Sequence, residues 1–137
     1  TITKSMGAAD FLLGVCESWM TPALFLSVTF IAGAVISFFT GSSWGTFAIC
    51  IPIAVPMAYS FTGGQLGTLV YAAVGAVVSG GLFGDHCSPV SDTSVLSSLG
   101  AACDHIDHVR TQLPYALLAA AVSIILWIVV ALVGGAA

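Results

Sequence analysis

Charged side chains are scarce in this chain of 137 residues. It has two Lys or Arg and six Asp or Glu, 6% of the total, and a formal net charge of -4. No Asp, Glu, Lys, Arg or His lies between Glu17 and Asp85, and none follows Arg110. Soluble domains carry about 25% charged residues, so these few could not cover the surface of a soluble fold. So few basic residues also argue against a nucleic-acid partner or a polybasic membrane-surface role.

Support for common enzyme classes is weak as well. Residues 41–45 have the spacing G-x-S-x-G, but they lie in a small polar turn between two apolar arms and do not follow the strand that a serine hydrolase needs there. Gly80, Gly81 and Gly84 are not followed by the lysine of a P-loop and lack a Rossmann context. We therefore expect a protein that is not an enzyme and needs no cofactor. The chain starts at Thr1 without the regions of a signal peptide, so we expect it to be part of something longer.

Cysteine and histidine are few and poorly spaced for a metal site. The four cysteines form no C-x-x-C pair, which favours small apolar side chains in a membrane interior over a disulfide or redox role. His86 with Cys87, and Cys103 with His105 and His108, invite a zinc interpretation. Neither cluster has the paired spacing of a structural zinc site, so zinc is the weaker alternative.

Long apolar segments dominate the chain instead. Hydrophobic residues make up 58% of it, and the mean hydropathy is +1.10. This composition predicts an all-α integral membrane protein with helices of spanning length. The expected elements are an interfacial amphipathic segment at 1–20, an apolar hairpin at 22–61, a discontinuous helix at 65–103, a charged loop at 104–112 and a last transmembrane helix at 113–134, opened by Pro114.

The hairpin consists of two apolar arms around a small polar turn at residues 40–46. Its second arm, residues 47–61, is short and contains Pro52 and Pro56. Two full spans joined by a tight outer loop would fit this pattern, as would a re-entrant hairpin whose tip stops inside the membrane. We favour the re-entrant hairpin because the second arm is short and no charge holds the turn among lipid headgroups.

A polar stretch at residues 80–93 interrupts the next apolar helix. We expect helix over 65–79, a break, and a restart near residue 92 with Ser91 or Asp92 as the N-cap. The restarted piece is about 18 Å long at 1.5 Å per residue, roughly half a bilayer core. Irregular backbone at membrane depth survives only where protein or a water-filled cavity surrounds it. The break is therefore the first candidate for a binding site.

Asp85 and Asp92 are the main candidates within this break. A carboxylate at mid-membrane depth costs roughly 2.5–3.5 kcal/mol, so each needs a function or a local partner. Oxygen ligands suit a small cation such as Na+, and carboxyl groups removed from water bind a proton more readily. The structural alternative is that Asp92 caps a half-helix and Asp85 pairs with a backbone amide. We favour cation and proton handling, and the two roles can coexist.

Hydroxyl groups from the hairpin turn and the break are the expected neutral ligands. Polar turns flanked by apolar arms would place helix ends near the middle of the membrane, where free amides favour anions and free carbonyls favour cations. The candidate hydroxyl ligands are Ser42, Ser43, Thr46, Ser88, Ser91 and Thr93. For the hairpin turn taken alone, an ordinary loop is an equally good interpretation.

Three segments resemble the NhaC-type sodium/proton antiporters, a family within the wider ion transporter superfamily. They are residues 40–46, 84–93 and 103–115, which read TGSSWGT, GDHCSPVSDT and CDHIDHVRTQLPY. The resemblance runs from about residue 21 to the end. It implies that 21–137 is a transmembrane transporter repeat: one inverted-repeat half with a re-entrant hairpin, a discontinuous helix and a final transmembrane helix. The N-terminal repeat of the same transporter would be the missing partner.

The resemblance also implies a function. A secondary active antiporter would exchange Na+ for H+, with Asp85 and Asp92 in the ion site, across a bacterial or archaeal cytoplasmic membrane. Similar family members exchange organic acids such as malate and lactate, so Na+- or H+-coupled exchange of such acids is the close alternative. A non-transporting membrane module is the alternative from another class. A homodimer is a compatible assembly, and Arg110 suggests that its loop faces the cytoplasm.

Overall fold

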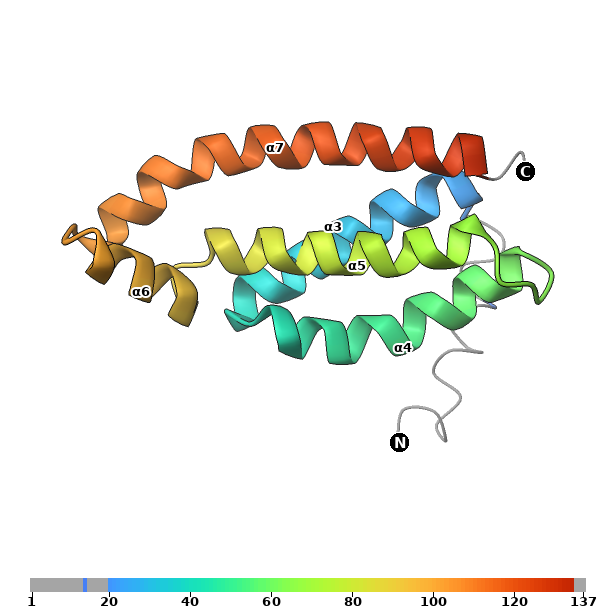
Figure 1. Ribbon diagram of the computed structural model, residues 1–137, viewed down its shortest axis with the longest axis horizontal. Coiled ribbons are helices and arrows are strands. Elements are labelled where there is room, and N and C mark those ends of the chain that lie inside the picture. The colour runs from blue at the N-terminus through green and yellow to red at the C-terminus, as the bar shows by residue number, and fades with distance from the viewer. Residues whose placement is uncertain (1–13, 15–19, 135–137) are drawn as a thin grey trace.

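Helices and short connections make up the part of the chain that the computed structural model describes, residues 14 and 20–134. The helices are α3 Pro22–Thr40, α4 Ser43–Phe61, α5 Thr68–Cys87, α6 Asp92–Gly100 and α7 His105–Gly134 (Figure 1). Ser43–Phe61, Thr68–Cys87 and His105–Val133 are each long and apolar enough to cross a membrane. The predicted all-α class is therefore confirmed. The predicted interfacial segment at 1–20 lies outside the described residues apart from Gly14 and Met20.

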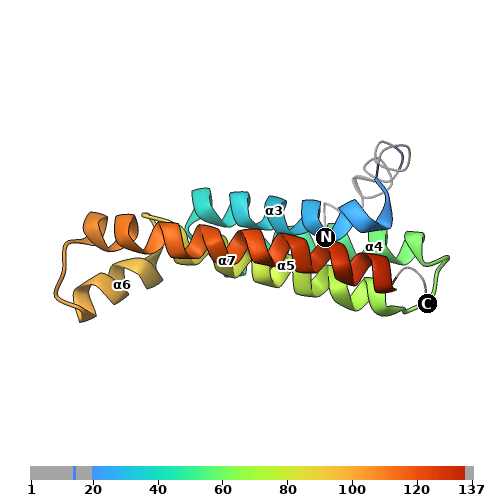
Figure 2. The ribbon, with the colours of Figure 1, turned by 90° about the horizontal axis from the view of Figure 1, so that it is seen from above.

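The helices α3, α4 and α5 form a bundle, and α7 runs along it (Figure 1). Apolar side chains of α3 and α5 form much of the core, including Phe25, Leu26, Phe30, Ala73 and Val77. The short α6 and the first turns of α7 extend beyond the end of the bundle (Figures 1 and 2). The hairpin tip between α3 and α4 lies at this same end of the bundle, next to the break between α5 and α6 (Figure 1).

Glycines allow α3 and α5 to lie close together. Gly80 and Gly84 are one helical turn apart on α5, in the small-residue spacing typical of packed membrane helices. A Cβ atom at Gly80 would overlap the carbonyl oxygen of Phe30, and one at Gly84 would overlap that of Ala34. The prediction that helix ends at residue 79 is therefore wrong. The glycines serve the contact between two helices, and α5 continues through them to Cys87.

The break is shorter than predicted and lies at residues 88–91. Pro89 has no N–H and disfavours helical backbone at Ser88, whose ψ is 129°. The helix restarts as α6 at Asp92, with Ser91 in the N-cap position. The Ser91 side chain makes no cap hydrogen bond. Its predicted position at the N-cap is therefore right, and its predicted capping hydrogen bond is wrong. Its hydroxyl hydrogen-bonds to Asp85 instead.

The second arm of the hairpin is longer than predicted. α4 begins at Ser43 because the Ser42 hydroxyl accepts a hydrogen bond from the Gly45 N–H at 3.3 Å and caps the helix. Nineteen residues span roughly 28 Å at 1.5 Å per residue, with Pro52 and Pro56 inside the helix. The premise of a short arm is therefore wrong, and the re-entrant position of the hairpin stays a prediction.

The charged segment before the last span is helical rather than a loop. α7 begins at His105, so residues 105–112 are its first turns and Pro114 lies inside it. The Asp104 carboxylate caps it, with Oδ1 accepting from the N–H groups of Ile106 and Asp107 at 2.9 and 3.2 Å. Pro114 leaves only the carbonyl of exposed Arg110 without its helical partner, where water can satisfy it. These two features explain why the helix starts early.

Candidate functional site

Asp85 is the buried charged side chain of the described residues, with 7% of its surface exposed. It lies near the end of α5. The Ser43 hydroxyl, from the first turn of α4, donates to Oδ2 at 3.1 Å, and the Ser91 hydroxyl, from the break, donates to Oδ1 at 2.7 Å. Each carboxylate oxygen thus receives one hydroxyl hydrogen bond. The hairpin tip and the helix break meet at this carboxylate.

A third hydroxyl, that of Thr93, extends the group towards the start of α6. The oxygens of Ser91 and Thr93 are 2.7 Å apart, and either atom could be the donor by distance alone. A serine hydroxyl has a single hydrogen, and Ser91 gives its own to Asp85. Thr93 must then donate to Ser91. The oxygen of Thr93 therefore keeps its free lone pairs for another donor or for a cation.

The remaining predicted hydroxyl ligands stabilise the backbone of the hairpin tip and of the helix break. The Ser88 hydroxyl donates to the Phe38 carbonyl at 2.7 Å and accepts from the Val90 N–H at 3.2 Å, which joins the break to the end of α3. The Thr46 hydroxyl donates to the Ser42 carbonyl at 3.0 Å. The structure thus brings Ser43, Ser91 and Thr93 into the group around Asp85. The hydroxyls of Ser42, Thr46 and Ser88 form hydrogen bonds with backbone groups instead.

The backbone of the hairpin tip rests directly on the break. Gly41 ends α3 in the left-handed region, with φ of 64°, where a side chain is disfavoured. A Cβ atom there would lie 2.8 Å from the Val90 carbonyl oxygen. Glycine is therefore needed at this position both for its conformation and for the close approach. This contact fixes the distance between the start of α4, which carries Ser43, and the residues after Pro89.

Asp92 lies apart from this group. It is exposed on the first turn of α6, and no hydrogen bond joins its side chain to another group in the described part of the chain. Negative charge at a helix N-terminus is favourable, which gives Asp92 a local role. The structure therefore brings one of the two predicted carboxylates into the buried group, and leaves the other at the surface.

The residues of the zinc interpretation are dispersed. Over residues 14 and 20–134, no three His, Cys, Asp or Glu side chains gather closely enough to hold a metal ion. His105 has a different use, because its Nε2 lies 2.7 Å from the Pro89 carbonyl and its Nδ1 lies 3.2 Å from the Ser98 hydroxyl. It thereby ties the break and α6 to the first turn of α7. Sequence reasoning missed this contact, because no local sequence pattern indicates it.

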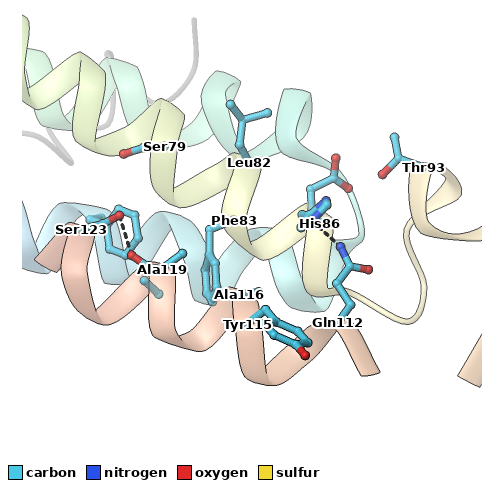
Figure 3. Close-up of a pocket in the computed structure, with 13 residues that line it drawn as sticks. Ser79, Leu82, Phe83, His86, Thr93, Gln112, Tyr115, Ala116, Ala119 and Ser123 are labelled. Carbon is cyan, nitrogen blue, oxygen red and sulfur yellow. Dashed lines mark hydrogen bonds between the residues drawn. The ribbon is translucent and has the colours of Figure 1, made fainter. Parts of the chain in front are cut away.

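A cavity of about 620 Å³ lies beside Asp85, between α5, α7 and the start of α6 (Figure 3). Five of its polar side chains gather towards one end: Asp85, His86, Thr93, Gln112 and Tyr115. Ser79 and Ser123 line the other end (Figure 3). Its apolar wall is Phe30, Leu82, Phe83, Ala116, Ala119 and Ala120. His86 and Gln112 face each other across the cavity and are hydrogen-bonded through their Nε2 atoms. Sequence reasoning missed Gln112 and Tyr115, because their place depends on how α7 packs.

Comparison with known proteins places the chain in one family. A profile of the Na+/H+ antiporter family matches residues 1–132. An uncharacterized protein of Haemophilus influenzae is 52% identical over 133 residues, 95% of this chain and 25% of the relative. The malate-2H+/Na+-lactate antiporter of Bacillus subtilis is 36% identical over 129 residues, 94% of this chain and 26% of the relative.

A third relative is the Na+/H+ antiporter NhaC of Alkalihalophilus pseudofirmus. It is 32% identical over 124 residues, which cover 90% of this chain and 26% of the relative. The chain thus spans about a quarter of the length of the curated relatives it matches. No solved structure matches it significantly.

Proposed function

Because the chain belongs to the Na+/H+ antiporter family, we propose that it is part of a secondary active antiporter that exchanges Na+ for H+ across a membrane. Family and apolar helices together make it an integral membrane protein. The observation that carries the proposal is the buried Asp85 carboxylate, held between the hairpin tip and the helix break. One carboxylate can hold either ion, and this competition couples their movements.

The hydroxyl groups around Asp85 suit both loaded states. A hydroxyl rotates freely and offers either a hydrogen or a lone pair. Ser43 and Ser91 donate to the carboxylate as the structure has them. With Na+ present they would turn their oxygens to the ion. With a proton on Asp85, the carboxyl O–H would donate to one of them.

Asp92 is our proposed second carboxylate of the site. It follows Ser91 directly and precedes Thr93, both of which belong to the group around Asp85. Its exposure in this part of the chain leaves it free to face the rest of the longer transporter. The helix N-termini of α4 and α6, at Ser43 and Asp92, lie at the same end. The positive ends of these two helices attract negative charge.

A second candidate function is Na+- or H+-coupled exchange of organic acids. The cavity beside Asp85 favours it, because its volume of about 620 Å³ lies in the range of sites for small molecules. A relative named for malate and lactate exchange shares 36% identity with the chain. Helix N-termini near the cavity would also attract an acid's carboxylate.

The two candidates separate in vesicles that contain the full-length transporter. We expect an imposed Na+ gradient to drive proton movement in the absence of any organic acid, followed with a pH-sensitive dye inside the vesicles. Proton movement that starts only after malate or lactate is added would favour the second candidate. Vesicles that carry the Asp85→Asn protein serve as the control for leak.

Ser91→Ala tests the hydroxyl part of the site. Hydrogen bonds to charged groups contribute about 1.5–3 kcal/mol, and 1.4 kcal/mol corresponds to a tenfold change in affinity. We therefore expect the Na+ concentration for half-maximal flux to rise about tenfold or more. Ser97→Ala is the matched control, since Ser97 is exposed on α6 and bonds only within its own helix. Equal effects of the two substitutions would contradict a role for the Ser91 hydroxyl at the site.

A further inference from the structure

The helix break contacts the hairpin tip on one side. The Ser88 hydroxyl donates to the Phe38 carbonyl, and the Val90 carbonyl lies where a side chain at Gly41 would be. These contacts do not engage the carbonyl of Pro89, which belongs to no helix. In the described part of the chain, no backbone N–H bonds to this carbonyl. A carbonyl group without a backbone partner needs another hydrogen-bond donor.

His105, at the start of α7, supplies this donor. Its Nε2 atom lies 2.7 Å from the Pro89 carbonyl oxygen, and its Nδ1 atom lies 3.2 Å from the Ser98 hydroxyl of α6. Because a carbonyl oxygen only accepts, Nε2 must carry a hydrogen. The two contacts through different ring atoms fix the orientation of the ring. Residues 89–105, which include all of α6, thus form a loop that this ring closes.

The bond to Pro89 needs an N–H group rather than a charge. The Ser98 hydroxyl has one hydrogen, which goes either to the Val95 carbonyl at 2.8 Å or to Nδ1. In the first case Nδ1 carries a hydrogen as well, and His105 is an imidazolium. In the second case the ring is neutral and its hydrogen is on Nε2. Both forms donate to Pro89, so the break is held in either protonation state.

We propose that His105 is a positioning residue of the ion site, which acts through Pro89 on Ser91. The inference rests on the proposed function and adds to it a residue that does not itself touch the ion. Only one residue separates Pro89 from Ser91. The Ser91 hydroxyl donates to Asp85 Oδ1 at 2.7 Å, and such a bond weakens steeply when its angle is lost. Holding the Pro89 carbonyl therefore holds the Ser91 hydroxyl on Asp85.

Two substitutions at His105 separate the N–H group from the ring. Leucine removes both donor atoms, whereas glutamine keeps a neutral N–H at a similar distance from the backbone, and the two have similar helix propensity. In vesicles with the full-length transporter, we expect His105→Leu to raise the Na+ concentration for half-maximal proton flux about threefold to tenfold. His105→Gln should stay close to wild type. Maximal flux should change less than the half-maximal concentration in both variants.

His108→Leu is the matched control for these substitutions. His108 is also a half-buried histidine in the first turns of α7, and no hydrogen bond joins its ring to another group among the described residues. It should therefore keep the wild-type half-maximal Na+ concentration. A loss in His105→Gln as large as that in His105→Leu would overturn the role of the N–H group, because it would show that the imidazole itself is needed.

A double-mutant cycle tests whether His105 acts through Ser91. The proposed effect requires the Ser91 hydroxyl, so His105→Leu should change the half-maximal Na+ concentration by less than about twofold in a Ser91→Ala background. Equal effects of His105→Leu in the two backgrounds would overturn the action through Ser91. A merely structural role of His105 predicts such equal effects, together with a loss of folded protein.

Hydrogen–deuterium exchange tests the hold on the break without any transport. The Val90 and Ser91 N–H groups are bonded to Ser88 at 3.2 and 3.4 Å, so their exchange reports how often the break opens. We expect exchange at residues 88–91 to be about threefold to tenfold faster in His105→Leu, and unchanged in His105→Gln. Unchanged exchange in His105→Leu would overturn the inference and leave the Na+ site intact. Faster exchange in His105→Leu, in a transporter whose wild type shows no Na+-driven proton flux, would support the hold on the break and contradict the proposed function.

Discussion

Asp85→Asn is expected to lower Na+-driven proton flux in the full-length transporter by about 100-fold or more. Asparagine keeps the size of the side chain and can still bond to the Ser43 and Ser91 hydroxyls. It can neither release a proton nor carry the negative charge that a cation needs. The loss should therefore appear in transport while the amount of folded protein in the membrane stays near that of wild type. Flux in reconstituted vesicles and size-exclusion profiles would measure the two quantities.

Other aspartates provide the controls for this result. Asp107→Asn changes an exposed carboxylate on the first turn of α7 and should retain wild-type flux. Asp92→Asn should lose less flux than Asp85→Asn, because Asp92 is exposed and outside the buried group. Undiminished transport in Asp85→Asn, or a defect in expression alone, would instead favour a packing role, as in a non-transporting module.

Gly84→Ala is expected to destabilise the transporter by about 1–3 kcal/mol, towards the upper end of the range for overpacking. The added Cβ would overlap the Ala34 carbonyl oxygen, and backbone cannot move aside as the end of a flexible side chain can. α3 would have to separate from α5, which would also shift the hairpin tip away from Asp85. Thermal unfolding of the detergent-solubilised full-length protein would measure the loss.

Gly100→Ala is the matched control for this substitution. Gly100 is the last residue of α6, and a Cβ atom there would meet nothing within 4 Å. Alanine also favours helix over glycine by about 1 kcal/mol in a helix interior. Gly100→Ala should therefore be as stable as wild type or slightly more stable. A Gly84→Ala protein with the stability of Gly100→Ala would show that α3 and α5 do not need this close contact.

Chemistry at the break could be predicted from the sequence because the free-energy cost of a charge in lipid is large and local. A carboxylate amid apolar residues needs partners, and this argument singled out Asp85 together with six hydroxyl residues. Three of them, Ser43, Ser91 and Thr93, join the group around Asp85. The same argument gave Asp92 equal weight. The burial of one and the exposure of the other follow from where α5 ends and α6 begins, which is a matter of tertiary packing.

Helix boundaries were harder to predict because the same residues serve two purposes. Glycine weakens an isolated helix, but Gly80 and Gly84 are where α5 packs closely against α3. The sequence pattern predicts a helix start at Pro114, although Asp104 caps α7 ten residues earlier in the chain. Asp104 lies two residues before Ile106 and three before Asp107, which is the usual spacing between an N-cap side chain and the N–H groups it caps. This signal can be found in the sequence. The contact between His86 and Gln112 had no such local signal.

Proton release on Na+ binding tests the central claim most directly. Calorimetric titration of the purified full-length transporter with Na+, in buffers of different ionisation enthalpy, counts the protons that leave the protein for each Na+ bound. If Na+ and H+ compete for Asp85, wild type near the pH at which Asp85 holds a proton should release about one proton per Na+. Asp85→Asn should release none. Na+ binding without proton release at any pH, or unchanged release in Asp85→Asn, would contradict a site shared by the two ions.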